Sequence, residues 1–374
     1  FKREAEKEGL RVFMPLLPRQ GKSALASYLE REPVTVPKYH WDMSDPLLCT
    51  EMVLGTGDIF RTGSAAGPGS QQLLSNLGIA QKNPEGPSQT ALSRVVQGAQ
   101  GTMAIVTWAS IKLGMLPRVH RPYFVQESNF AKLVDFSYRV LRLKFADDFF
   151  ILNRFALASM LCEKPAEIKS FASRQAPFTL FYCVAGYEHF PEKRVSYQEN
   201  GIAGIAQYHG VRISPEITGA SGRRVMDMLN NPAEEPYWKL RYKGGFREIF
   251  FLTTLDRAAR FMEIMEGVAE KRAYPPQEMG IYVQPIQQGR NCHLEFDLFF
   301  DPGDEKEANR VEAMFSEAIL LLADAGAFFS RPYGPVAQVA YARCPDTVKA
   351  LRMVKGILDP QGVLNRGKLC FGEV

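Results

Sequence analysis

The sequence predicts an α+β protein of two domains, one of them built on an antiparallel sheet. Its 374 residues exceed what a single compact core usually holds, so two domains are expected. From about residue 125 onward, strand-like runs alternate with amphipathic helical runs, and strands meet in hairpins. Glycine-bearing turns lie both before and after this region.

We expect residues 1–117 to form the first domain, 118–345 the second, and 346–374 a segment that returns to the first. In the first domain, residues 51–61 indicate a hairpin around a glycine-rich turn, and residues 101–117 indicate a buried strand pair. Residues 63–90 are rich in Gly, Pro, Ser and Gln, which predicts a long loop.

In the second domain, residues 128–162 have helical periodicity. Strands are expected at 177–186 and 245–252, a hairpin at 279–300, and helices at 255–272, 305–325 and 346–358. Residues 192–200 and 222–240 are helical or irregular.

Within the run 292–300 (CHLEFDLFF), apolar and polar residues alternate from Cys292 to Leu298. Because residues two apart in a strand share a face, His293, Glu295 and Asp297 lie together, opposite the apolar even-numbered residues. This polar face is either solvated, as is usual for antiparallel sheets, or it lines a buried site. In the second case a histidine beside carboxylates could act as acid, base or metal ligand.

Composition excludes several classes of function. Hydrophobic residues make up 46% and charged residues 23%, and the net charge of +4 gives no reason to expect a nucleic-acid partner. None of the six cysteines is spaced as CxxC, so we expect no bound metal and free thiols in a reducing, cytoplasmic location. The most apolar stretch, 129–162, carries many charges, so no transmembrane segment is expected, and no signal peptide is visible.

Three segments together carry a resemblance to a known family. They are GAQGTMAIVT at 98–107, VLGTGDIFRTG at 53–63 and LDPQGVLNRGK at 358–368. In this order and spacing they resemble the flavin-dependent oxidoreductases of the vanillyl-alcohol-oxidase/PCMH type, which include glycolate oxidase and D-lactate dehydrogenase flavoproteins. The chain departs from the family pattern at Ala99, Gln100, Ala104 and Arg366, where Ser, Glu, Gly and Pro are usual.

The resemblance implies FAD as cofactor, held by a partial PCMH-type FAD-binding domain under an α+β cap. The implied cofactor-binding residues are Gly98, Gly101, Thr102, Ile105, Ser23, Asn365 and Lys368. Residues 1–117 correspond to the second subdomain of the family's flavin domain, and we expect the N-terminal subdomain to be absent from the chain. Another chain or a preceding segment then completes the site, or flavin binding has been lost. His120 is one candidate for covalent attachment of the flavin.

Candidate catalytic residues follow from the same resemblance. His293 matches the histidine of the hydroxy-acid branch's glycine-asparagine-leucine-histidine strand, here residues 290–293. That branch's serine-glycine-glutamate-histidine-glycine signature is replaced by Ser-Arg-Pro-Tyr-Gly at 330–334. Arg331 and Tyr333 there are closer to the phenol-oxidising branch, so they join His293 as catalytic candidates. Glu295, Arg247 and Tyr282 are candidates for binding the substrate, because an arginine fork suits a carboxylate.

Three hypotheses stay open. The chain is an FAD-dependent oxidoreductase that oxidises a 2-hydroxy acid or an aromatic alcohol or phenol, with a small molecule as substrate and hydride transfer to the flavin. Alternatively, it is an accessory or catalytically altered subunit of a flavoprotein complex, in which a partner chain completes the flavin site or accepts electrons. The third hypothesis is a binding module of ferredoxin-like topology.

Overall fold

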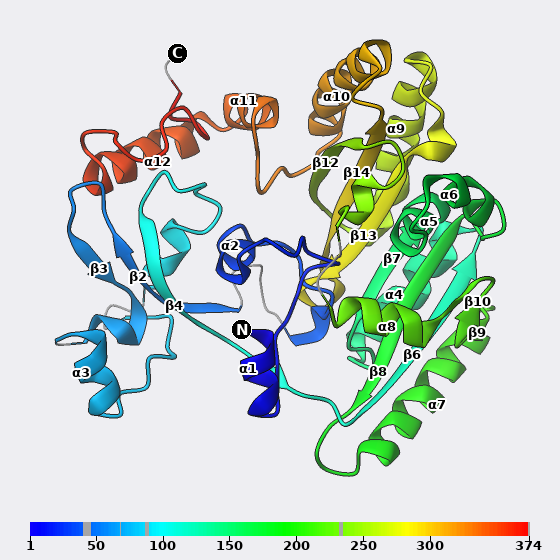
Figure 1. Cartoon of the computed structure of the whole chain (residues 1–374), viewed down its shortest axis with the longest axis horizontal. Coiled ribbons are helices and arrows are strands. Elements are labelled where there is room, and N and C mark those ends of the chain that lie inside the picture. Colours follow the sequence, from blue (N-terminus) through cyan, green and yellow to red (C-terminus); the bar gives the residue numbers. More distant parts are fainter. Residues whose placement is uncertain (40–45, 68, 87–89, 232–234, 373–374) are drawn as a thin grey trace.

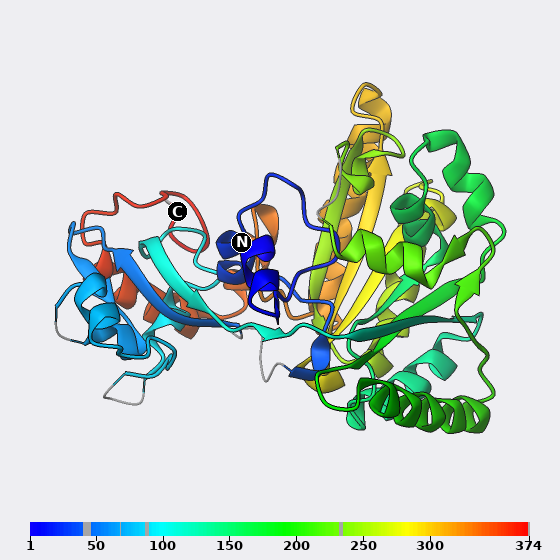
Figure 2. The same cartoon turned by 60° about the horizontal axis from the view of Figure 1, so that its bottom comes forward.

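The computed structural model describes residues 1–39, 46–67, 69–86, 90–231 and 235–372, which form two lobes (Figures 1 and 2). The larger lobe holds a seven-stranded sheet with helices on both faces, and the smaller lobe holds a three-stranded sheet. The N-terminal segment, with α1 (Lys2–Lys7), β1 (Leu10–Arg11) and α2 (Ala24–Leu29), lies between them. The expected α+β class with an antiparallel sheet is confirmed.

Every neighbouring pair of strands in the large sheet is antiparallel. In spatial order the strands are β12 (Gly245–Thr253), β14 (Asn291–Phe300), β13 (Gly280–Ile286), β7 (Phe149–Asn153), β8 (Phe178–Gly186), β6 (Val119–Glu127) and β9 (Ile213–Ser214).

Each face of this sheet carries its own hydrophobic core, because alternate residues of the strands point to opposite sides. The helices that pack on the first face are α4 (Phe130–Arg142), α7 (Pro191–His209), α9 (Ala258–Lys271) and α10 (Glu305–Asp324). Those on the second face are α5 (Arg154–Leu161), α6 (Pro165–Ala172) and α8 (Gly222–Leu229), near the short hairpin of β10 (Glu216–Ile217) and β11 (Ala220–Ser221). No helix among the described residues has both the length and the apolarity that crossing a bilayer requires.

The small lobe pairs β3 (Ile59–Arg61), β2 (Leu47–Val53) and β4 (Ile105–Ile111), with α3 (Gln71–Asn76) beside them. The chain returns to this lobe through α11 (Pro335–Ala342) and α12 (Pro345–Leu358) (Figure 1). The hairpin turn after β2 rests on the end of α12, where the Gly55 amide donates to the Leu358 carbonyl at 2.9 Å. A Cβ on Gly55 would lie only 2.2 Å from an oxygen of Asp359, so no larger residue fits this contact.

Two sequence-based expectations were wrong in detail. Residues 128–162 are not helical throughout, because β7 lies between α4 and α5. Since β7 is covered on both faces, its residues are almost all apolar and show no alternation that would mark a strand. The expected strand pair at 101–117 does not form either. After β4, the short β5 (Gly114–Met115) pairs with β1 instead.

Candidate active site

A cavity of about 510 Å³ lies where the N-terminal segment meets the edge of the large sheet. Its lining comes from residues 15–33, from the segment 237–239, from β12, β13 and β14, and from the loop 331–336. All six residues expected to act on the substrate line it: His293, Tyr333, Arg331, Glu295, Arg247 and Tyr282. The fold therefore brings three strands and a distant loop to one chamber.

His293 and Glu295 form the polar floor of this cavity. The even-numbered residues of β14 enter the first hydrophobic core, so the odd-numbered ones face the other side of the sheet, and both side chains are buried. His293 Nε2 lies 3.0 Å from Glu295 Oε2. A carboxylate can only accept, so Nε2 carries the hydrogen and Nδ1 keeps the lone pair of a neutral ring. Burial is the main cause that lowers the pKa of His293, so the neutral ring can accept a proton at neutral pH.

A buried lysine lies beneath this pair. The Lys239 ammonium is 2.5 Å from Glu248, 2.5 Å from Glu295 and 3.0 Å from Asp297. Burial alone would lower the pKa of Lys239, but the surrounding carboxylates outweigh burial and raise that pKa well above its usual value. Burial, with Glu295 and Glu248 nearby, raises the pKa of Asp297 well above its usual range, despite the opposing Lys239 charge.

Glu295, by contrast, stays ionised. Burial alone would raise its pKa, but Lys239 and His293 reverse that effect and hold the pKa of Glu295 below its usual value. Sequence reasoning missed Lys239, which lies in a short turn at Trp238–Leu240. A single lysine in an irregular stretch carries no signal of this role, because its three partners come from two strands.

Arg331 is buried, with 7% of its surface exposed, and its guanidinium lies 4.4 Å from the centre of the Phe250 ring. Among the described residues no carboxylate forms an ion pair with it, and its Nε has no hydrogen-bond partner. Nearby, Tyr333 is in edge contact with Phe250, and burial raises the pKa of its phenol, which stays protonated at neutral pH. A cation and a hydroxyl donor thus lie together in the cavity wall.

Arg247 occupies a different setting. Its guanidinium pairs with Glu312 at 3.3 Å and lies 4.1 Å from the Phe315 ring, on the half-exposed side of the chamber. The rest of the wall is rich in aromatic rings: Tyr237, Trp238, Phe246, Phe250, Phe315, Tyr282 and Tyr333. Such rings suit a flat apolar ligand.

The turn predicted to approach the cofactor is tied to the loop that bears Arg331. The Gln100 side chain donates to the Pro332 carbonyl at 2.7 Å, and the Arg31 guanidinium donates to the Ser330 carbonyl at 2.5 Å. Gly98 has φ +72°, a conformation that favours glycine, and a Cβ there would lie 2.6 Å from that guanidinium. The Asn365 amide donates to the Gln100 carbonyl. The glycine-bearing turn at 98–101 therefore contacts both the C-terminal segment at Asn365 and the loop that bears Arg331.

The remaining candidates for cofactor binding differ in burial and in hydrogen bonding. Thr102 is buried and its hydroxyl donates to the Ala99 carbonyl at 2.7 Å, while its own carbonyl accepts from Lys355. Ser23 caps α2 by accepting from the Ala26 amide at 3.4 Å. Ile105 and Lys368 are exposed, and neither lines the 510 Å³ cavity.

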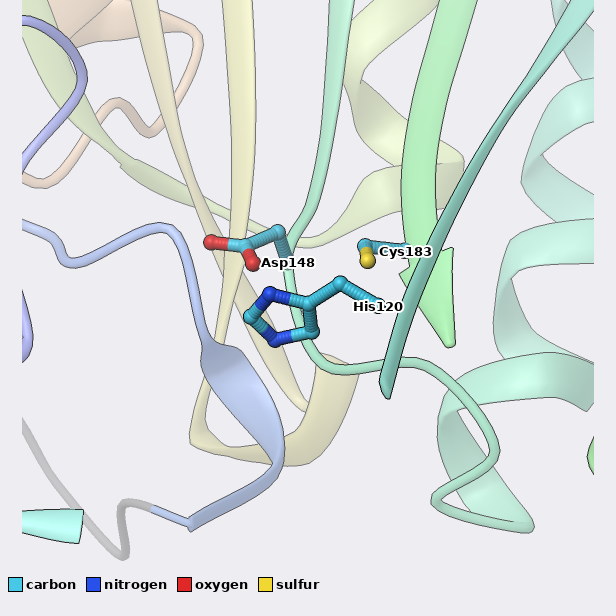
Figure 3. A group of neighbouring side chains, drawn as sticks. All are labelled: His120, Asp148 and Cys183. Atoms are coloured by element: carbon cyan, nitrogen blue, oxygen red, sulfur yellow. The ribbon is translucent and has the colours of Figure 1, made fainter. Parts of the chain in front are cut away.

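His120 lies in a separate cluster with Asp148 and Cys183 (Figure 3). Arg11 donates to both oxygens of Asp148 at 2.8 Å, and Thr35 donates to one of them at 2.7 Å. These contacts fasten the N-terminal segment to the large lobe. Burial first, and Arg11 second, lower the pKa of His120, so the ring is neutral at neutral pH. His120 is not part of the lining of the cavity.

Comparisons with known proteins identify one family segment and a set of solved structures with a similar fold. Residues 289–369 match the model of the family of FAD linked oxidases, C-terminal domain. The fold is similar to that of p-cresol methylhydroxylase with substrate bound, with a TM-score of 0.78 and 17% identity over 99% of this chain and 73% of that chain. It is equally similar to 4-ethylphenol oxidase from Gulosibacter chungangensis in its isoeugenol complex, with a TM-score of 0.78 and 16% identity over 99% of this chain and 74% of that chain.

Alkyldihydroxyacetonephosphate synthase shares the fold more distantly, with a TM-score of 0.60 and 13% identity over 98% of this chain and 62% of that chain. No curated protein sequence gives a significant match. The matched family segment includes His293, Arg331, Tyr333 and Asn365, whereas the cavity-lining residues of 15–33, 237–239, β12 and β13 lie outside it. Residues 289–369 therefore match the C-terminal domain of the FAD linked oxidases, and the chain as a whole shares the fold of p-cresol methylhydroxylase.

Proposed function

We propose that this FAD-dependent oxidoreductase oxidises a small aromatic alcohol or phenol in the 510 Å³ cavity. One observation carries the proposal, namely the buried Arg331 guanidinium, which has no carboxylate partner among the described residues and lines the same chamber as His293. A buried cation without a partner is costly, so an anionic or strongly hydrogen-bonding ligand group is its natural complement. The aromatic walls favour a ring over a short aliphatic acid.

The residues near the glycine turns fit FAD. Gly101 has φ +70°, and a Cβ placed on it would meet only Asn365, at 3.8 Å, so the backbone there is open to a flat ring. Gly98, Gly101, Thr102 and Asn365 would hold the cofactor on this side, with Ser23, Ile105 and Lys368 further along it. When bound, FAD supplies the acceptor for the hydride.

The chain's own residues have distinct roles in this proposal. Arg331 binds the phenolic oxygen through two of its N–H groups, and the Tyr333 hydroxyl donates a further hydrogen bond. The aromatic walls pack against the ring and exclude water. The hydride leaves the substrate carbon that bears the alcohol hydroxyl. His293 takes the proton of that same hydroxyl, so that the alcohol becomes a carbonyl compound.

The test uses the chain mixed with FAD under anaerobic conditions, followed by flavin absorbance. We expect 4-hydroxybenzyl alcohol to bleach the flavin and D- and L-lactate to leave it oxidised. Bleaching by lactate alone would move the substrate class to 2-hydroxy acids, with Arg331 as the partner of the carboxylate. A flavin that binds but is reduced by neither class would overturn the proposal.

A second candidate is a subunit whose flavin site is completed by another polypeptide. The elements that carry the glycine turns expose large apolar side chains: Ile59, Ile105, Met353 and Ile357. Helix α12 has no fully buried residue. If FAD does not bind to the isolated chain, and binds only after a flavoprotein partner is added, this candidate replaces the first.

A further inference from the structure

Lys239 has no part in the proposed reaction, yet three carboxylates, those of Glu248, Glu295 and Asp297, surround its ammonium. Its side chain is 4% exposed, and a buried ammonium is stable only when it is paired. The centres of the aromatic rings of Trp238 and Phe246 lie 5.3 Å and 5.6 Å from the ammonium, within the range of cation–π contact. The ammonium is therefore held in one place by rings and carboxylates together.

The partners of Lys239 lead directly to His293. Glu295 presents one oxygen to the ammonium at 2.5 Å and the other to His293 Nε2 at 3.0 Å. The rings of Phe250 and Tyr282 lie 5.6 Å and 5.7 Å from the imidazole. The charged groups that act on His293 are Glu295, Arg331 and Lys239. Glu295 thus bridges a fixed cation and the candidate base.

We propose that Lys239 is a positioning residue, whose ammonium holds Glu295 in place so that this carboxylate fixes the His293 ring with its hydrogen on Nε2 and its lone pair on Nδ1. The effect of Lys239 on the rate of turnover rests on the proposed function. The tautomer of the His293 ring rests on the geometry of the structure alone. The two can therefore be tested separately.

The first test needs no flavin and no substrate. The chain has five histidines, so ¹⁵N-labelled imidazoles can be followed by NMR over a pH series, and H293A identifies the signal of His293. Lys239→Met removes the charge and keeps an unbranched side chain one atom shorter, and Lys239→Arg restores a cation. Lys243→Met is the matched control, because Lys243 pairs with Glu278 and Glu307 outside this cluster, at 3.1 Å and 2.6 Å.

We expect the wild-type His293 signal to be that of a single neutral tautomer with hydrogen on Nε2. In Lys239→Met, the pKa of the ring should rise by about one unit. The positive charge of Lys239 then no longer opposes protonation of His293, and His293 no longer shares Glu295 with Lys239. Lys239→Arg should shift the signal back, and Lys243→Met should leave it unchanged. A His293 signal identical in wild type and Lys239→Met would overturn the proposal.

Glu295→Gln serves if Lys239→Met does not fold. It leaves the lysine in place and removes the anion, so the ring should titrate lower than in wild type, and unchanged titration there would equally overturn the proposal. Reduction of FAD by the aromatic alcohol is the second readout. Lys239→Met should lower the rate about tenfold or more with little change in KM, and Lys239→Arg should recover part of it.

Failure of the two proposals can be told apart. If the His293 signal responds as expected but no substrate reduces the flavin in the wild type, the positioning role stands and the proposed function falls. If the flavin is reduced but Lys239→Met leaves both the rate and the signal unchanged, the positioning role falls and the proposed function stands.

Discussion

Two buried aspartates, one in each lobe, show how differently the two halves of the molecule use a carboxyl group. Asp297 in the large lobe is fully buried near Glu295 and Glu248, and its pKa is raised well above the usual value. Asp359 in the small lobe is 2% exposed. Burial would raise the pKa of Asp359 too, but Lys355 and the backbone N–H groups of Leu364 and Val363 hold that pKa below its usual value.

The opposite pKa shifts of Asp297 and Asp359 distinguish a reactive region from a structural one. At the cavity floor, like charges are crowded together around one ammonium, an arrangement that is costly for stability and typical of sites that move protons. In the small lobe, the carboxylate accepts hydrogen bonds from two backbone amides and pairs with a lysine, which fastens the C-terminal turn under the Gly55 hairpin. We therefore expect substitutions at the cavity to affect chemistry and those in the small lobe to affect stability or cofactor binding.

The largest effect is expected for His293→Ala. Loss of a positioned proton acceptor usually costs about 10²- to 10⁴-fold in rate, so flavin reduction by the aromatic alcohol should fall by that amount. Stopped-flow absorbance under anaerobic conditions measures it, with the exposed His189→Ala as control. A rate within a factor of two of wild type would remove His293 from the mechanism.

Arg331→Ala should raise KM by about 10- to 100-fold, because a hydrogen bond to a charged group contributes roughly 1.5–3 kcal/mol. Arg247→Ala is the matched control, since it also lines the cavity but has its own partner in Glu312. Steady-state kinetics with the aromatic alcohol give both values. An equal rise in KM for both variants would mean that the unpaired guanidinium has no special role.

Gly101→Ala tests the cofactor side. Its positive φ makes alanine strained, at a cost of about 1 kcal/mol, and the new methyl group would also face the expected flavin. We expect FAD affinity to fall about tenfold in a fluorescence titration. Gly57→Ala has the same kind of strain at φ +89° with open space around it, so it should lose similar stability and keep its affinity. Equal affinity in the two variants would move the flavin away from Gly101.

The smallest effect is expected for the stability of Asp359→Asn, and this effect should depend on pH. Because the pKa of Asp359 is lowered in the folded state, its contribution to stability is present above the unfolded value of about 3.9 and is lost as the pH falls through the folded value. Asp359→Asn should therefore lower the melting temperature at pH 7 by an amount corresponding to about 1 kcal/mol, and by progressively less in acid. A difference between variant and wild type that does not shrink towards low pH would contradict this account.

Much of the site could be predicted from the sequence, because local pattern carries it. The alternation from Cys292 to Leu298 places His293 and Glu295 on one face, and short glycine-bearing motifs identify the turns near 55, 101 and 367. Strand β7 was missed because a doubly covered strand has no alternation, and Lys239 was missed because a lone lysine in an irregular turn resembles any surface lysine.

By itself, the sequence determined the α+β class, the family resemblance and the residue types available for chemistry, since these depend on periodicity and short motifs. Only the tertiary structure decided that the polar face of β14 is buried rather than solvated, because the covering residues come from segments 15–33, 237–239 and 331–336, far away along the chain. It also decided that Arg331 lacks a carboxylate partner among the described residues while Arg247 has one. Burial and pairing depend on what lies opposite in space, and no local pattern encodes that.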